Sequence, residues 1–197
     1  MTRIALATNN PHKIRELTTL LADLGVEVAT MTEFPSAPEL REDGSTFRDN
    51  ALQKARTVHA ATALPALADD SGLEVFYLNG RPGVLSARYA GTNTTDERNN
   101  EKLLDEMRGV APRRRRAQFR ALCAFVDGST EIVTEGICPG TLGESPRGTN
   151  GFGYDPIFIP DGFTRTYAEL TAEEKNQISH RSKAIGRMKE ALKSLKR

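Results

Sequence analysis

The stretch RIALATNNPHKIRELTTLLADLGVEVA, residues 3–29, decides the architecture of the N-terminal part of the chain. Its first apolar run, Arg3 to Ala7, is typical of a short buried strand. After a polar turn, apolar residues recur from Ile14 to Leu24 at the spacing of an amphipathic helix. A second apolar run follows at Val26 to Ala29. The stretch therefore predicts a strand, a helix and a second strand in that order.

The two ends of this helix are marked by residue types that suit helix termini. Asn10 is a good N-cap, because its side chain can accept hydrogen bonds from the first-turn N–H groups. Pro11 fits the first helical position, where no N–H is needed. Gly25 stands where a left-handed residue commonly ends a helix. Local chemistry therefore defines both ends.

The middle of the chain continues the alternation of helices and strands. A proline-containing connector at 34–45 precedes a helix. The expected buried face of that helix comprises Phe47, Ala51, Ala55 and Val58. Ala66 to Ala68 is strand-like, and the polar run at 69–72 is expected to interrupt it before 73–78. The acidic residues Asp69 and Asp70 are therefore expected at a strand end.

The second half of the chain is richer in hairpins. Asn79-Gly80 and Asp127-Gly128 are both typical of tight hairpin turns. A charged helix is expected at 95–107, and a C-terminal helix is expected after a capping-box pattern at 171–174. Because helices alternate with strands early and hairpins dominate later, we expect an α/β fold. Its expected form is a mixed twisted sheet flanked by helices, with two lobes and a central active-site cleft.

Composition excludes several classes of protein. The chain has 197 residues, and 27 Lys plus Arg against 26 Asp plus Glu give a formal net charge of +1, so no nucleic-acid partner is expected. Cys123 and Cys138 form no CxxC pair, which argues against a zinc site and a disulfide scaffold. No signal peptide or membrane span is evident, so we expect a cytoplasmic protein with no membrane partner.

The first candidate site lies where the first strand meets the first helix. Thr8, Asn9, Asn10 and Lys13 occur there, and free backbone N–H groups at a helix start attract phosphate. The alternative is a simple N-cap beside a solvated lysine. The GxxxxGK[ST] pattern is absent, which disfavours a P-loop NTPase.

The second candidate site is a set of carboxylates. Glu42 lies in the connector, and Asp69 and Asp70 follow a strand. Clustered carboxylate oxygens are the ligands that Mg²⁺ prefers. Lys54, on the next helix, is placed to orient a water molecule or to steady a phosphoryl oxygen. The alternatives are ordinary turn chemistry for the Asp-Asp pair and an exposed helical lysine.

Two further candidate sites lie near the C-terminus. In the segment 151–156, GFGYDP, glycines allow close backbone approach and two aromatic rings offer a stacking surface for a planar base. The alternative is a strained turn whose rings join the core. Lys175, His180 and Arg181 bring donors together near a helix start, where they suit a carbonyl or phosphate oxygen. The alternative is a group of surface charges.

Six motifs in register resemble the inosine triphosphate pyrophosphatase family. They are TNNPHK at 8–13, EDGSTFRDNALQKA from 42, ADDSGL from 68, SARY from 86, FGYDP from 152 and SHR at 179. The resemblance spans nearly the whole chain and implies a single pyrophosphatase domain, 1–197, with two lobes. Members of this family are Mg²⁺-dependent and usually homodimeric. They hydrolyse ITP, dITP and XTP to the nucleoside monophosphate and pyrophosphate, which removes deaminated purines from the nucleotide pool.

The resemblance also implies roles for individual residues. Asp70 is expected to be the base that activates water, with Lys54 beside it, and the metal ligands are expected to be Glu42 and Asp70, supported by Asp69. The expected substrate-binding residues are Thr8, Asn9, Asn10, Pro11, His12, Lys13, Ser71, Arg88, Phe152, Gly153, Tyr154, Asp155, Lys175, His180 and Arg181.

Simple hydrogen-bond chemistry agrees with an oxo-purine substrate. Hypoxanthine and xanthine present a carbonyl oxygen at C6, whereas adenine presents an amino donor there. Donors from His180 and Arg181 suit the carbonyl. Facing adenine they would lose their partners, at roughly 1–3 kcal/mol for each unsatisfied group.

Two other functions stay open at this point. One is a nucleotide-binding or RNA-binding module without hydrolysis, for which the basic run Arg113 to Arg116 is the only local support. The other is a pyrophosphatase that prefers another modified nucleotide, such as a pyrimidine.

Overall fold

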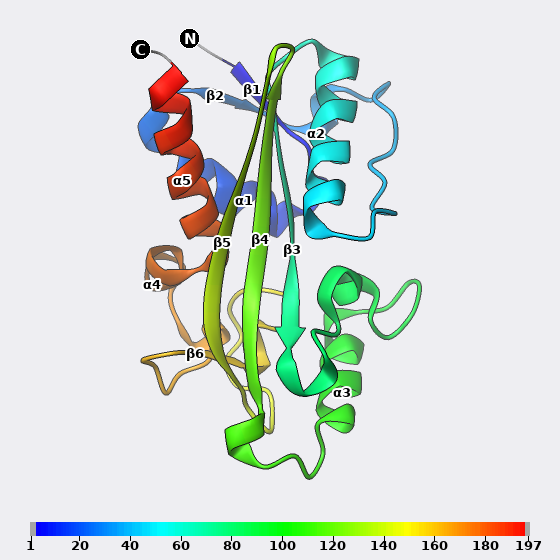
Figure 1. Ribbon diagram of the computed structural model, residues 1–197, viewed down its shortest axis with the longest axis vertical. Helices are drawn as coiled ribbons and strands as arrows, with labels where there is room; N and C mark the ends of the chain where they lie inside the picture. Colours follow the sequence, from blue (N-terminus) through cyan, green and yellow to red (C-terminus); the bar gives the residue numbers. More distant parts are fainter. Residues whose placement is uncertain (1–2, 196–197) are drawn as a thin grey trace. The chain divides into compact units, whose positions relative to one another are not determined.

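The computed structural model describes residues 3–195 and contains one six-stranded sheet flanked by helices. The strand order is β2-β1-β3-β4-β5-β6, with β1 parallel to β2 and β3, and β5 antiparallel to β6 (Figure 1). The strands are β1 (Arg3–Leu6), β2 (Glu27–Ala29), β3 (Ala66–Val75), β4 (Arg116–Asp127), β5 (Thr130–Leu142) and β6 (Phe158–Pro160). The expected mixed α/β sheet is confirmed.

Five α-helices and several short 3₁₀ turns connect these strands in the described part of the chain. The helices are α1 (Pro11–Leu21), α2 (Phe47–Thr62), α3 (Asp96–Glu106), α4 (Ala172–Ile178) and α5 (His180–Leu195). Two compact units result. Unit 1 holds the residues up to Asp70, Ala121–Gly136 and the residues from Arg181 on, and unit 2 holds Ser71–Arg120 and Ile137–His180. Strands β3, β4 and β5 contribute residues to both units.

The core of unit 1 forms between its sheet strands and two helices. Leu17 of α1 and Ile185 and Met188 of α5 are fully buried in one cluster with Leu6 and Cys123. In Figure 1, α1 and α5 lie on one side of these strands and α2 lies on the other. All four apolar residues predicted for the α2 face are buried. The helical spacing in the sequence therefore predicted correctly which faces of these helices are buried.

The predicted start of the first helix is confirmed, whereas its α-helical part ends at Leu21, earlier than predicted. Asn10 is the N-cap of α1, and its side chain accepts hydrogen bonds from the backbone N–H groups of His12 and Lys13. Pro11 is the first helical residue. Gly25 ends the following 3₁₀ turn with a φ of 62°, a left-handed conformation that glycine adopts at little cost.

The core of unit 2 is rich in aromatic rings. Phe119, Phe158 and Tyr167 pack together with Leu103 and Met107 of the α3 region. The rings of Phe119 and Phe158 meet edge to face with centroids 4.8 Å apart. Unit 2 therefore has a hydrophobic core of its own.

The interruption expected after Ala68 is wrong. Strand β3 runs without a break from Ala66 to Val75, so Asp69 and Asp70 lie inside a strand and not at its end. Both side chains are buried, at 0% and 5% exposure. The polar run does not break the strand, because cationic side chains from other elements compensate the two carboxylates.

The C-terminal helix is also different from the prediction. Its capping box at Thr171 is present, but α4 ends at Ile178 and α5 starts at His180. Ser179 between them is extended, with φ −67° and ψ 157°. The segment therefore forms two helices separated by one extended residue.

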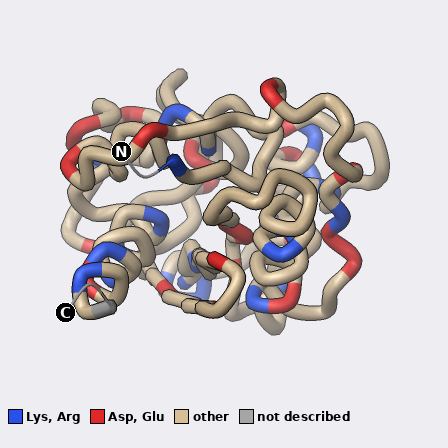
Figure 2. The backbone as a smooth tube through the Cα atoms, turned by 90° about the horizontal axis from the view of Figure 1, so that it is seen from above, with Lys and Arg blue, Asp and Glu red and all other residues tan. Residues whose placement is uncertain are grey.

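Charged residues of both signs are interspersed along the backbone, as Figure 2 shows, in keeping with the net charge of +1. Cys123 and Cys138 are both buried. Within residues 3–195, no helix is both long enough and apolar enough to cross a bilayer.

Candidate functional site

The start of α1 differs from a simple phosphate cradle. The side chain of Asn10 accepts from the N–H groups of His12 (2.9 Å) and Lys13 (3.3 Å). The N–H of Asn10 donates to Oγ1 of Thr8 at 3.1 Å. The expectation of free amides here is therefore wrong, because two side chains of the same motif satisfy them. The Lys13 side chain points elsewhere, toward β3.

Three acidic residues of unit 1 gather around lysine side chains. The Nζ of Lys54 lies 2.5 Å from Oε1 of Glu42 and 3.1 Å from Oδ1 of Asp70. It also donates to the backbone oxygen of Asp69 at 2.8 Å. Lys54 is only 3% exposed, so the alternative of a solvated helical lysine is wrong. We call Glu42, Asp69, Asp70, Lys13 and Lys54 the carboxylate cluster.

Asp69 is held differently from Asp70. Its Oδ1 accepts from Nζ of Lys13 at 2.7 Å and from Nη2 of Arg181 at 3.0 Å. Arg181 also pairs with Glu16 of α1. Helix α5 thus brings a buried guanidinium to a strand that lies far away in the sequence. The carboxylate of Asp69 faces these two cations, while that of Asp70 faces Lys54.

The electrostatics follow from burial and pairing. Burial disfavours ionisation of Glu42, but the Lys54 ammonium outweighs it and lowers the pKa of that carboxyl. At Asp70 burial dominates and raises the pKa of the carboxyl. At Asp69 burial is outweighed by Arg181 and Lys13, which hold the pKa of its carboxyl far below the ordinary value. The three carboxyl groups therefore have distinct environments.

The carboxylate oxygens of this cluster suit a divalent cation that is also bound by phosphate oxygens of a substrate. Glu42 and Asp70 both reach the same ammonium, so their oxygens converge on one cationic position. Among residues 3–195, no three His, Cys, Asp or Glu side chains come close enough to hold a metal together. Mg²⁺ in phosphoryl-transfer sites is commonly held by one or two carboxylates plus substrate phosphates. Two convergent carboxylates therefore fit that ion, whereas the third, Asp69, is engaged by Lys13 and Arg181.

In unit 2, the residues predicted for base recognition form a second cluster. Lys175 donates from Nζ to Oδ2 of Asp155 at 2.6 Å, and both are buried. The same Nζ lies 4.9 Å from the ring centroid of Phe152. Oδ2 of Asp155 also accepts from the N–H of Phe152 at 3.0 Å. The three side chains are therefore mutually positioned, with a cation over one ring face.

His180 and Tyr154 join the core of unit 2. The His180 ring stacks on Phe119 with centroids 4.7 Å apart and an interplanar angle of 10°. Tyr154 is 3% exposed and donates from its hydroxyl to the carbonyl of Ser86 at 2.9 Å. Burial raises the pKa of the Tyr154 hydroxyl. Of the two aromatic rings predicted as a stacking surface, Tyr154 thus belongs to the core, and Phe152 is partly exposed.

The remaining predicted substrate residues lie close to these clusters in the chain. Ser71 follows Asp70 in β3, and Arg88 ends a 3₁₀ turn at Gly83–Arg88; both are half-buried. Asn9 and Pro11 are exposed at the start of α1, where His12 is half-buried. Their roles stay predictions.

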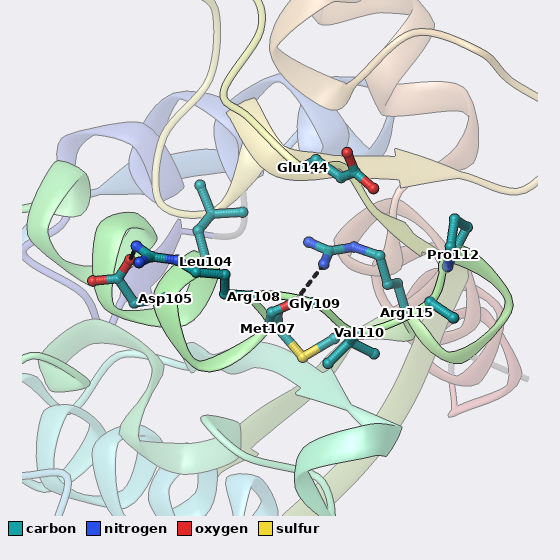
Figure 3. A pocket seen from close by; sticks show the side chains of 10 residues that line it. Leu104, Asp105, Met107, Arg108, Gly109, Val110, Pro112, Arg115 and Glu144 are labelled. Atoms are coloured by element: carbon teal, nitrogen blue, oxygen red, sulfur yellow. Dashed lines mark hydrogen bonds and ion pairs between the residues drawn. The ribbon is translucent and has the colours of Figure 1, made fainter.

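Two pockets of unit 2 differ in their residues. One, of about 510 Å³, is lined by the first turns of α3 and by the loop 146–153, and it includes Phe152 and Gly153. The other, of about 570 Å³, lies at the end of α3 (Figure 3). There the buried Arg115 donates to the carbonyls of Met107, Leu142 and Gly143. Arg115 thus links the end of the α3 region to the end of β5 and the residue after it. Of these two pockets, only the first is lined by residues that were predicted to bind substrate.

Sequence reasoning missed two residues, one that contacts the carboxylate cluster and one that contacts the Arg181 side chain bound to it. Asn50 donates from Nδ2 to Oδ2 of Asp70 at 3.0 Å, and Glu16 pairs with Arg181. A signal for Asn50 was present. It falls with Lys54 on the buried stripe of α2, where a polar residue needs a partner.

Comparisons with known proteins identify relatives over nearly the whole chain. The sequence profile described as the Ham1 family matches residues 4–191. A dITP/XTP pyrophosphatase of Streptomyces coelicolor is 52% identical over 189 residues, covering 94% of each chain. One of Geobacillus kaustophilus is 49% identical over 191 residues, covering 96% of this chain and 94% of the relative. The structure of a HAM1 protein from Coxiella burnetii superposes with a TM-score of 0.89 at 43% identity, covering 98% of this chain and 100% of that one.

Proposed function

Because the chain belongs to the Ham1 family, we propose that it hydrolyses non-standard purine nucleoside triphosphates. The proposed substrates are ITP, dITP and XTP, and the products are the nucleoside monophosphate and pyrophosphate. Relatives that are about half identical over nearly their whole length carry the name dITP/XTP pyrophosphatase, which supports this substrate class. The reaction would remove deaminated purines from the nucleotide pool.

One observation carries the chemical part of the proposal. Glu42 and Asp70 lie 28 positions apart in the chain. Both contact the buried Nζ of Lys54, so their oxygens surround a single cationic position. A pair of carboxylates of this kind is the protein's usual share of a magnesium–phosphate site.

Glu42 and Asp70 are the proposed ligands of Mg²⁺, with Asp69 supporting the site through Lys13. When bound, the ion would neutralise charge on the phosphate oxygens. Lys13 and Lys54 both lie at the carbonyl of Asp69, at 3.4 and 2.8 Å, and are the proposed cationic neighbours of the triphosphate. Thr8 to His12 and Arg88 are the further proposed contacts for phosphate oxygens.

Asp70 is the proposed general base. Its carboxylate would accept a proton from a water molecule as the water oxygen attacks the α-phosphorus. The bond from the α-phosphorus to the bridging oxygen breaks, and pyrophosphate leaves. Lys54 and Asn50 contact the two oxygens of Asp70, at 3.1 and 3.0 Å, and would hold the carboxylate in one orientation. Positioning and electrostatics supply most of the catalysis in such reactions.

Residues of unit 2 are proposed to recognise the purine. Phe152 offers a ring face, and Lys175 beside it is a cationic donor that suits a carbonyl oxygen. Ser71, Gly153, Tyr154, Asp155 and His180, together with Arg181, complete the proposed set. An amino group at C6 would face donors here, which favours oxo-purines over adenine.

A direct assay tests the proposed function. The protein is incubated with Mg²⁺ and ITP, XTP, GTP, ATP or dTTP in turn, and pyrophosphate and monophosphate are quantified. We expect both products in equal amounts from ITP and XTP, and far less from ATP and dTTP. Binding without product would identify a binding module, and a preference for dTTP would identify a pyrimidine-directed enzyme. A homodimeric state is a further proposal that follows from the family resemblance, and a cytoplasmic location is a further proposal that follows from the composition of the chain.

A further inference from the structure

We infer that Asn50 is a positioning residue that joins the connector carrying Glu42 to the carboxylate of Asp70. This inference rests on the proposed metal site and adds to it a residue that sets the spacing of the two ligands. All the residues involved lie in unit 1.

Both polar atoms of the Asn50 side-chain amide form hydrogen bonds. Its Nδ2 donates to Oδ2 of Asp70 at 3.0 Å, and its Oδ1 accepts from the backbone N–H of Gly44 at 2.8 Å. Asn50 is 1% exposed, so neither bond competes with bulk water. A backbone N–H can only donate and a carboxylate can only accept, so the two partners define the orientation of the amide. An aspartate could not make both bonds, because an ionised carboxylate has no donor.

Gly44 brings the connector close to α2. A Cβ atom at Gly44 would lie 2.7 Å from Oδ1 of Asn50 and 2.9 Å from Cβ of Asp49. Real Cβ contacts are longer than this, so only glycine allows the backbone to approach the amide so closely. Gly44 is two residues after Glu42. The bond to Asn50 therefore restrains the backbone immediately beside one proposed metal ligand.

The other proposed ligand is restrained from the same helix. Asn50 and Lys54 are one turn apart on the buried stripe of α2. Asn50 contacts Oδ2 of Asp70 and Lys54 contacts Oδ1, so each carboxylate oxygen has its own partner. Rotation of the Asp70 carboxylate would break both bonds. Helix α2 thus orients Asp70 directly and locates Glu42 through Gly44 and Lys54.

Residues that orient metal ligands in this way strongly affect metal affinity. Loss of such an outer hydrogen bond typically weakens metal binding or activity by roughly 10- to 100-fold. We therefore expect that Asn50→Ala weakens binding of a divalent metal ion to Glu42 and Asp70, although both carboxylates remain in the protein.

The test measures Mn²⁺ binding to the full-length protein by electron paramagnetic resonance, without nucleotide and thus without turnover. Asn50→Ala is expected to weaken Mn²⁺ binding by roughly 10- to 100-fold. In a separate assay with ITP, raising the Mn²⁺ concentration is expected to restore part of its turnover. The turnover of Asp70→Asn is expected to stay low at every metal concentration, because this variant lacks the proposed base.

His59→Ala is the matched control. His59 lies in the last turn of the same helix and also links two backbone segments, through Leu64 O at 2.7 Å and Gly128 N at 2.9 Å. It touches none of the carboxylates by these bonds, so its loss is expected to leave Mn²⁺ binding unchanged. Equal weakening by His59→Ala and Asn50→Ala would overturn the inference, because it would reflect general loosening of α2.

A second variant approaches the same contact from the other side. Gly44→Ala retains the amide of Asn50 but forces it or the connector to move, and it is expected to weaken Mn²⁺ binding as Asn50→Ala does. It keeps the inference testable if Asn50→Ala does not fold. Unchanged Mn²⁺ binding in a folded Asn50→Ala or Gly44→Ala protein would overturn the positioning role.

Failure of the proposed metal site has a different signature. If Glu42→Gln and Asp70→Asn bind Mn²⁺ as tightly as the unchanged protein, the carboxylate pair is not the metal site, and the inference falls with it. If those two variants lose Mn²⁺ and Asn50→Ala retains it, the metal site stands and only the role of Asn50 is wrong.

Discussion

Arg181 donates from Nη2 to Oδ1 of Asp69 across 3.0 Å, although 112 positions separate the two residues in the chain. Both side chains are buried, at 1% and 0% exposure. The pair is surrounded by Lys13 and Glu16, so α1, β3 and α5 are joined through charges inside unit 1. A buried pair of this kind is costly to break, because the remaining partner keeps an uncompensated charge.

Asp69→Asn is expected to destabilise the protein by about 3–5 kcal/mol, because it leaves Arg181 and Lys13 without their shared carboxylate. The free energy of unfolding in urea measures the effect. Asp161→Asn is the control, since Asp161 pairs with Arg116 where both side chains are nearly half exposed. The control should change stability by only about 0–1 kcal/mol. Equal losses in the two variants would contradict the assignment of Asp69 as a buried counter-ion.

Asp70→Asn is expected to leave the fold intact and to lower turnover of ITP by about 10²- to 10⁴-fold, the usual contribution of a general base. Asparagine has the same shape and keeps an oxygen for a hydrogen bond, so packing is preserved. Steady-state pyrophosphate release and a thermal melt measure the two effects. Near-normal turnover in this variant would reject Asp70 as the base.

Lys175→Met is expected to raise KM for ITP roughly 10- to 100-fold. This change corresponds to the free energy of about 1.5–3 kcal/mol that is lost with a hydrogen bond to a charged group. The change removes the cation that lies beside Phe152 and pairs with Asp155. The matched control is Lys189→Met, because Lys189 of α5 pairs with Asp23 of the 3₁₀ turn Ala22–Leu24, also within unit 1. The kinetic constants for ITP in both variants decide the matter. An unchanged KM in a folded Lys175→Met protein would exclude Lys175 from substrate binding.

Tyr89→Phe is expected to change how the free energy of unfolding depends on pH above about pH 10. Burial and a hydrogen bond to Glu106 raise the pKa of Tyr89 to about 12. An unfolded tyrosine titrates near pH 10, so the folded state holds this proton more tightly. The stabilisation is fully present below about pH 10 and is lost as pH rises toward about 12.

Urea unfolding of the unchanged protein and of Tyr89→Phe, at about pH 8 and about pH 11, gives the required comparison. The stability advantage of the unchanged protein should shrink at the higher pH. A constant difference at both pH values would show that Tyr89 titrates alike in the folded and unfolded states.

Local patterns in the sequence were sufficient for most helix starts and buried helix faces and for the family. The cap at Asn10, the buried stripe of α2 and the Thr171 capping box were predicted correctly. Each depends on residues within a few positions of one another, where helical geometry relates spacing directly to contact. The motifs that carry the resemblance are also local. The family match over residues 4–191 confirms the family that they indicate.

Only the tertiary structure decided how Asp69 and Asp70 are used. Locally the two aspartates suggest a break in the strand, but β3 continues through them, because Lys13, Lys54 and Arg181 from three different helices compensate the buried charge. The partners of these carboxylates lie between 16 and 112 positions away in the chain. No periodicity encodes such distances, since the contacts depend on strand order and helix placement. The sequence by itself therefore determined most of the local elements and the family, and the packing of helices on the sheet decided that β3 continues and which charges meet.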